Sequence, residues 1–125
     1  MRSQTWKYIS VAAFATIAII IATGIGYAYW SPLRISSEEA RKRIGAGATV
    51  LDVRSDPEFA LSHYHGSVHI PVNRLDTQVI GIIPDKSRPI VIYCNTGQRA
   101  RLAAEHLERL GYSNVAYIVG GYWTL

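Results

Sequence analysis

The chain has a single cysteine, Cys94, and its neighbours place it where a thiol can react. Residues 89–93 before it form an apolar, β-branched and aromatic run, which is typical of a buried parallel strand. Residues 95–99 after it, Asn-Thr-Gly-Gln-Arg, form a short polar loop, and residues 100–110 then repeat their apolar side chains at helical spacing. At such a strand-to-helix junction, backbone N–H groups and the positive end of the helix dipole favour an anionic sulfur. We therefore expect Cys94 to be a nucleophile.

The same cysteine also admits a purely structural interpretation, because free cysteines are often small buried hydrophobic residues. A structural cysteine needs neither a glycine-containing polar loop nor an arginine five residues later, so the setting favours a chemical role. A lone cysteine also excludes an intrachain disulfide and any CxxC redox or zinc pattern.

Motifs spread over nearly all of the chain after residue 33 resemble those of rhodanese-like domains. Each fragment is weak alone, but five in the family's order and spacing make a chance match improbable. They are Cys-x4-Arg at Cys94 and Arg99; Val50 to Arg54 with Pro57 to Phe59; His63-x-x-Gly66-Ser67 with Ile70-Pro71; Leu110 to Val115; and Gly120 to Trp123. The resemblance implies an α/β fold with a central parallel β-sheet flanked by helices.

Local patterns along the chain predict the same alternation of strands and helices. We expect a helix capped by Ser36-Ser37 and ended by residues 45–47, a short helix opened by residues 56–59, a helical segment within 72–83 and a helix over 98–110. We expect strands over 49–53, 67–70, 90–93 and 115–119, and a turn over 84–89. Alternating elements indicate a parallel sheet with helices on both faces. Ligands of such sheets bind at the carboxyl ends of the strands, where Cys94 lies.

The length of the loop after Cys94 separates two kinds of chemistry. Four residues between Cys94 and Arg99 resemble the sulfurtransferase loop of rhodaneses, whereas the related cysteine phosphatases use five. A shorter loop closes a tighter ring of N–H donors, which suits a sulfane sulfur better than a phosphoryl group. The resemblance implies that Cys94 takes sulfur from thiosulfate or a similar donor as a persulfide and passes it to cyanide, a thiol or a protein acceptor. A rhodanese module that binds a partner without turnover is the main alternative, although inactive members usually lose the cysteine.

The residues of the loop have roles implied by that mechanism. Asn95, Thr96, Gly97 and Gln98 would bind the substrate through their backbone N–H groups, with Gly97 allowing a geometry that a side chain would hinder. Arg99 has two alternatives, direct contact with the anionic intermediate or pairing with a buried carboxylate such as Asp52. Ala100 stands where family patterns often have serine or threonine, which removes one hydroxyl donor.

Two further groups of polar residues are predicted to lack a chemical role. Asp52 and Arg54 lie at the polar end of a buried strand, where charges generally persist as pairs, so we expect them to be structural support. Three histidines, His63, His65 and His69, cluster in the chain, but no cysteine or carboxylate set completes a metal site. We expect no metal and no other cofactor.

The segment over residues 8–30 contains no charged residue, and its centre, residues 11–22, is apolar all round. About 20 such residues span a bilayer, whereas the apolar region of a signal peptide usually has ~7–15. Aromatic side chains at both ends suit the membrane interface. We expect a single-pass transmembrane helix over 8–30 and the rhodanese-like domain over 31–125, with a cleaved signal as the alternative.

The distribution of charge bears on orientation and partners. Arg2 and Lys7 favour an N-terminus on the cytoplasmic side, whereas Arg34 and residues 41–43 favour the opposite orientation. Long domains translocate largely regardless of charge, so we expect an extracytoplasmic (periplasmic) domain. Without Arg2 and Lys7 the formal net charge of +4 falls to +2. This modest charge excludes a nucleic-acid partner, which requires a clustered basic face. The expected partners are membrane lipid, a thiosulfate-like donor and a thiol or cyanide acceptor.

Overall fold

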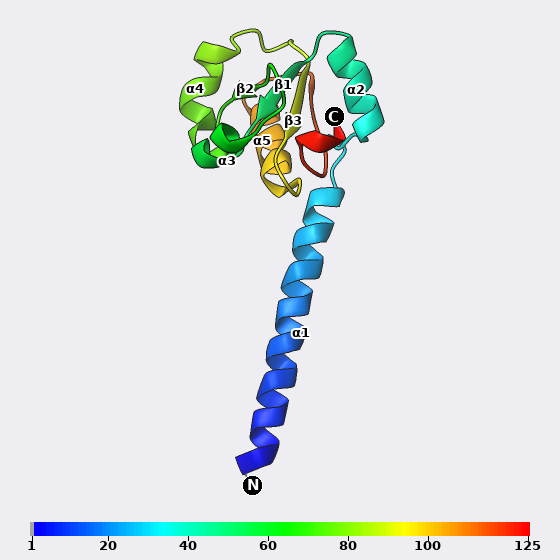
Figure 1. Ribbon diagram of the computed structural model, residues 1–125, viewed down its shortest axis with the longest axis vertical. Coiled ribbons are helices and arrows are strands. Elements are labelled where there is room, and N and C mark those ends of the chain that lie inside the picture. Colours follow the sequence, from blue (N-terminus) through cyan, green and yellow to red (C-terminus); the bar gives the residue numbers. More distant parts are fainter. Residues whose placement is uncertain (1) are drawn as a thin grey trace.

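A long N-terminal helix, α1 (Arg2–Tyr29), carries the rest of the chain as a folded domain at its carboxyl end (Figure 1). The structure is a computed structural model that describes residues 2–125 and, among their side chains, those of residues 6–24, 26, 27 and 29–125. The stretch Trp6–Gly24 of α1 has a mean hydropathy of 1.7, and none of its residues is buried in the protein. The expected N-terminal apolar helix is therefore confirmed, and its length and composition fit either a membrane span or a signal sequence.

Four parallel strands form the central sheet of the domain in the order β2-β1-β3-β4. Their bounds are β1 Thr49–Asp52, β2 Val68–His69, β3 Ile90–Tyr93 and β4 Val115–Tyr117. The expected α/β architecture with a parallel sheet is confirmed. The strands predicted over 49–53, 67–70 and 115–119 are each shorter than expected, because the chain leaves the ladder early to reach the loops at the carboxyl edge.

Helices cover both faces of this sheet. They are α2 (Ser37–Gly45), α3 (Asp56–Leu61), α4 (Leu75–Ile82) and α5 (Gln98–Arg109), with short 3-10 turns η1 (Val72–Arg74) and η2 (Tyr122–Thr124). On one face Leu51 and Ile92 pack with apolar residues of α4 and α5. On the other, Val50 and Val91 pack with residues of α2 and of the C-terminal segment. Side chains that alternate along each strand thus build two cores, which hold the strand ends in place.

The segment after α1 is tied to the edge of the sheet. The N–H of Tyr117 donates to the carbonyl oxygen of Leu33 at 3.0 Å, and the N–H of Ile35 donates to that of Tyr117 at 2.9 Å. These bonds make a parallel bridge between Arg34 and Tyr117 beside β4. The chain between α1 and the domain is therefore part of the sheet's edge.

Candidate active site

Cys94 lies where β3 ends, and its side chain has no exposed surface. The backbone N–H of Gly97 donates to its Sγ at 3.0 Å. Gly97 is also the N-cap of α5, and no side chain caps that end of the helix. Because glycine has no side chain, the N-cap leaves the first N–H groups of α5 without a side-chain acceptor at the end of the helix nearest Cys94. This cradle favours a thiolate or another anion.

Gly97 meets two requirements that a larger residue would violate. Its φ of 93° lies in the left-handed region, and a Cβ added there would lie 3.0 Å from the Cα of Val119. The loop therefore closes around the sulfur only because this residue has no side chain.

The other residues predicted in the loop lie around the mouth of the cradle. Thr96 and Gln98 are exposed, Asn95 and Arg99 are partly buried, and Ala100 is buried beneath them. Because the thiol itself has no exposed surface, a donor reaches it only when residues at the mouth move aside.

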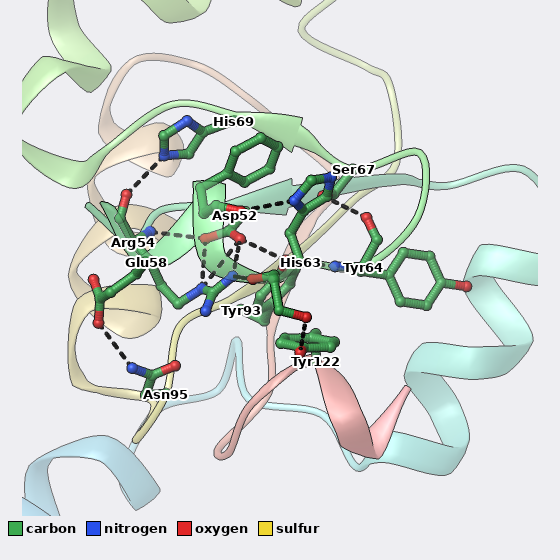
Figure 2. Close-up of polar contacts among 12 residues, drawn as sticks. Asp52, Arg54, Glu58, His63, Tyr64, Ser67, His69, Tyr93, Asn95 and Tyr122 are labelled. Carbon is green, nitrogen blue, oxygen red and sulfur yellow. Dashed lines mark hydrogen bonds and ion pairs between the residues drawn. The ribbon is translucent and has the colours of Figure 1, made fainter. Parts of the chain in front are cut away.

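Glu58 holds this loop from outside, and it is the residue that the sequence analysis missed. Its carboxylate accepts two bonds from Arg99, from Nη1 at 2.7 Å and from Nη2 at 3.0 Å. It also accepts a bond from Nδ2 of Asn95 at 2.8 Å, which Figure 2 shows. The bond from Arg99 is the largest of the effects that hold the pKa of Glu58 well below its usual range, and bonds from Ser55 add to it against the opposing effect of burial. One carboxylate thus clamps the first and last residues of the loop.

The first turn of α3 positions Glu58. Ser55 caps this helix, and Ser55 and Glu58 form a capping box in which the N–H of Ser55 donates to Oε2 of Glu58 at 2.8 Å. The spacing Ser-x-x-Glu with a proline between is a sequence signal for a helix start, and it was the available clue to a fixed carboxylate.

Asp52 and Arg54 form a buried ion pair at the end of β1, as Figure 2 shows. Asp52 is 0% exposed and Arg54 is 4% exposed, and the closest contact is Nη2–Oδ2 at 2.7 Å. Tyr93 donates its hydroxyl to the same carboxylate at 2.5 Å, and burial followed by this bond raises the pKa of Tyr93. Arg54 also donates to the carbonyl oxygen of Ser62 at 2.7 Å.

The pairing of Asp52 corrects one suggestion of the sequence analysis. Asp52 was offered as a carboxylate that could brace Arg99, but both of its oxygens are occupied by Arg54 and Tyr93. Arg99 pairs with Glu58 instead. In the structure Arg54 therefore pairs with Asp52, and Arg99 pairs with Glu58.

Two of the three clustered histidines lie on either side of the Phe59 ring. The rings of His63 and His69 stack on it at 3.8 and 4.1 Å. His69 contacts the carbonyl oxygen of Arg54 through Nε2 at 2.8 Å, and His63 contacts that of Phe59 through Nδ1 at 2.8 Å. His65 is exposed. Among the residues that the structure describes, no group of three or more histidine, cysteine or carboxylate side chains is arranged to hold a metal.

Known proteins with related sequences carry the same kind of domain. Thiosulfate sulfurtransferase GlpE of Ectopseudomonas mendocina is 33% identical over 89 residues, which cover 71% of this chain and 80% of that protein. Thiosulfate sulfurtransferase PspE of Escherichia coli is 31% identical over 65 residues, which cover 52% of this chain and 62% of that protein. This second match therefore spans less than two thirds of its relative.

The structural comparison agrees with the sequence comparison. The human single-domain sulfurtransferase TSTD1 superposes with a TM-score of 0.66 at 25% identity, covering 75% of this chain and 95% of that one. Residues 36–123 match the rhodanese-like domain family, and this stretch contains the whole sheet and the Cys94 loop. The chain belongs to the rhodanese-like domain family.

Proposed function

We propose that this protein is a membrane-anchored sulfurtransferase that carries a sulfane sulfur on Cys94 as a persulfide. The observation that supports this most directly is the bond from the Gly97 N–H to Cys94 Sγ at the uncapped end of α5. That arrangement stabilises negative charge on sulfur both before and after transfer. The names of the matched relatives, which are thiosulfate sulfurtransferases, point to the same donor.

The reaction proceeds by two displacements at sulfur. The Cys94 thiolate attacks the outer sulfur of thiosulfate, the bond between the two thiosulfate sulfurs breaks, and sulfite leaves with the bonding electrons. Cyanide or a thiolate then attacks the outer sulfur of the persulfide and releases the Cys94 thiolate with thiocyanate or a new persulfide. Charge balances in each step, and no oxidant or reductant is consumed.

In this mechanism Arg99 braces the loop. Its two bonds to Glu58 form a planar fork, which suits arginine better than a point contact with sulfur does. The fork fixes the carboxyl end of the loop while Asn95 fixes the start, so the N–H groups of the cradle stay aimed at the sulfur. The buried pair of Asp52 and Arg54 supports the strand end behind them.

The anchor is α1, with the domain on the extracytoplasmic side of the membrane. The stretch Trp6–Gly24 is long enough to cross a bilayer; Trp6 begins it and Trp30 follows it, where aromatic side chains suit the membrane interface. A buried single thiol is compatible with an oxidising compartment, because burial slows its reaction with oxidants in solution. The partners are membrane lipid, a thiosulfate-like donor and a small thiol, cyanide or protein acceptor.

Intact-mass analysis of the detergent-solubilised chain tests the chemistry. After thiosulfate treatment we expect the mass of one added sulfur atom, its removal by cyanide with formation of thiocyanate, and no adduct on Cys94→Ser. An unchanged mass, with the protein folded, would contradict the enzymatic function and leave the non-catalytic binding module as the better account.

A further inference from the structure

The apolar stretch of α1 ends at the catalytic loop. A Cβ added to Gly24, the last residue of the stretch, would lie 2.9 Å from Nε2 of Gln98. The Tyr27 ring, one turn further along α1, stacks on the Arg101 guanidinium at 4.0 Å, and its hydroxyl donates to Glu105 at 3.5 Å. Gln98 and Arg101 belong to the first turns of α5, directly after the Cys94 loop. The anchor therefore contacts the start of α5, at the residue that follows Gly97.

The length of α1 then gives the height of this contact above a bilayer. The 19 residues of Trp6–Gly24 rise about 28 Å, which matches the ~30 Å of a hydrocarbon core. Residues 25–29 rise a further ~7 Å, about the depth of one headgroup layer. With Trp6 and Lys7 at one interface and Gly24 at the other, Gln98 lies at the boundary of the hydrocarbon and Arg101 lies among the headgroups.

The orientation of the domain on α1 is fixed by contacts on two sides. Leu33 and Ile35 are hydrogen-bonded to Tyr117 of β4, and the Arg34 guanidinium stacks over the Tyr29 ring at 4.4 Å. Figure 1 shows α3 and the loop before α5 on the side of the domain toward α1, and the turn between α4 and β3 on the far side. The carboxyl edge of the sheet thus faces the membrane.

Large apolar side chains are exposed around this edge. Trp123 is 66% exposed and its indole covers Gly121, two residues beyond Val119, which packs on Gly97 of the catalytic loop. Leu61 is 88% exposed and precedes Ser62, whose hydroxyl bonds to that of Tyr122. Trp30 is exposed where α1 gives way to the domain. Tryptophan and leucine in such positions suit a membrane interface.

From these observations we propose that the carboxyl edge of the sheet docks on the lipid surface, with Leu61 and Trp123 in contact with lipid and the mouth of the Cys94 cradle at headgroup level. The partner of this surface is the bilayer that holds α1, so the proposal rests on the membrane anchor of the proposed function. Sulfur donors and acceptors then reach Cys94 along the membrane surface, which admits small anions and membrane-borne thiols and blocks a folded water-soluble acceptor.

Tryptophan quenching in the full chain tests this docking, because the sequence has three tryptophans that report on three positions. Variants that keep only Trp6, only Trp30 or only Trp123, with phenylalanine at the other two positions, are reconstituted into vesicles of phosphatidylcholine brominated on its acyl chains. Two variants without native tryptophan carry Leu61→Trp at the docking edge or Ile82→Trp at the far end of α4 as a matched control. Circular dichroism confirms that each variant is folded.

We expect Trp6, Trp30, Trp123 and Leu61→Trp to lose much of their fluorescence to the brominated lipid, and Ile82→Trp to keep its fluorescence. Suppose that Trp6 and Trp30 are quenched, but that Trp123 and Leu61→Trp are quenched no more than Ile82→Trp. That result would overturn the docking and leave the membrane anchor intact. Unquenched Trp6 and Trp30 would overturn the anchor, and the docking with it. Equal quenching of Ile82→Trp and Trp123 would show a domain without a preferred edge and would also overturn the proposal.

Discussion

At the scale of single residues, the site is a thiol whose surroundings are fixed by a distant carboxylate. Cys94 and Arg99 belong to one loop, but Glu58, which holds Arg99 and Asn95, comes from a helix 41 residues earlier than Arg99. The chemistry therefore depends on the packing of α3 against the start of α5. A change at Glu58 is expected to alter the loop around the Cys94 thiol, although Glu58 itself is hydrogen-bonded to Arg99 and Asn95 and not to the sulfur.

The Glu58→Gln variant is predicted to lose stability near neutral pH and to keep little activity. Losing the paired charge should cost about 1 kcal/mol for this partly exposed pair, or roughly 4–8 °C in Tm. The pKa of Glu58 is lower in the folded protein than in the unfolded chain, so its contribution is present above the unfolded value of ~4.3 and is lost as the pH falls through the folded value. The difference in Tm between wild type and variant should therefore shrink steadily on acidification below pH ~5.

Thermal unfolding of the detergent-solubilised chain at a series of pH values measures this difference. Glu38→Gln is the control, because Glu38 forms only an exposed pair with Lys42 at 3.4 Å and should change neither Tm nor turnover measurably. A difference between wild type and Glu58→Gln that stayed constant with pH would show that the charge of Glu58 does not stabilise the fold.

At the residue scale, the sequence predicted the position of Cys94 between a strand and a helix, because local periodicity carries that information. The roles of Cys94 and its loop in catalysis stay predictions. The partner of Arg99 was not found, since a pairing across 41 residues is set by the packing of α3 and leaves no periodic trace. The capping pattern Ser55-x-x-Glu58 marked the helix start and gave no indication of what the carboxylate faces.

At the scale of elements, the junction of β3 and α5 creates the cradle. Gly97 precedes α5 with a positive φ, leaves that helix without a side-chain cap and packs against Val119 in the segment after β4. The junction of β3 and α5 thus needs, at position 97, a residue that adopts left-handed backbone geometry and has no Cβ.

The Gly97→Ala variant is predicted to lose both stability and persulfide formation. The left-handed backbone alone should cost ~1–2 kcal/mol. The added Cβ also meets the backbone of Val119 at 3.0 Å, so the loop must shift away from the sulfur. Thiosulfate-dependent mass gain and Tm measure the two effects.

The Gly47→Ala variant separates the cost of the left-handed backbone from the effect of the contact with Val119. Gly47 has a similar φ of 104°, but a Cβ there meets nothing within 4 Å. This variant should lower Tm by the backbone cost alone and leave persulfide formation intact. Equal persulfide formation in Gly47→Ala and Gly97→Ala would mean that the cradle tolerates a side chain.

The sequence predicted the order and type of the elements well because each has its own hydrophobic period and its own caps. Strand ends were placed less accurately, since pairing stops where the loops of the carboxyl edge begin. The bridge between Arg34 and Tyr117 was not predicted at all. It joins the segment after α1 to β4 through backbone hydrogen bonds, which side-chain patterns do not encode.

At the scale of the whole molecule, the proposed function makes α1 a membrane anchor that sets where sulfur transfer takes place. The full chain is predicted to stay in the membrane fraction through alkaline carbonate washing and to keep its full mass, since inserting the apolar stretch Trp6–Gly24 is effectively irreversible. A soluble form that begins near residue 30 would instead show a cleaved signal. Because Cys94 is buried, a small membrane-impermeant thiol reagent should label it slowly in intact cells, each time the residues at the mouth of the cradle move aside. Labelling only after lysis would place the domain inside.

A catalytic edge at headgroup level also makes turnover sensitive to lipid charge. Thiosulfate is a dianion, and a surface potential of about −30 mV opposes its approach by ~1.4 kcal/mol, which lowers its local concentration about tenfold. In vesicles rich in anionic lipid, KM for thiosulfate should therefore be roughly ten times its value in phosphatidylcholine vesicles, with kcat unchanged. A monoanionic thiosulfonate donor should show only about the square root of that factor. Raising the ionic strength should remove both differences, because it shortens the ~8 Å screening length of physiological salt. A KM that is the same in both kinds of vesicle would place the mouth of the Cys94 cradle beyond the reach of the surface potential, away from the headgroups.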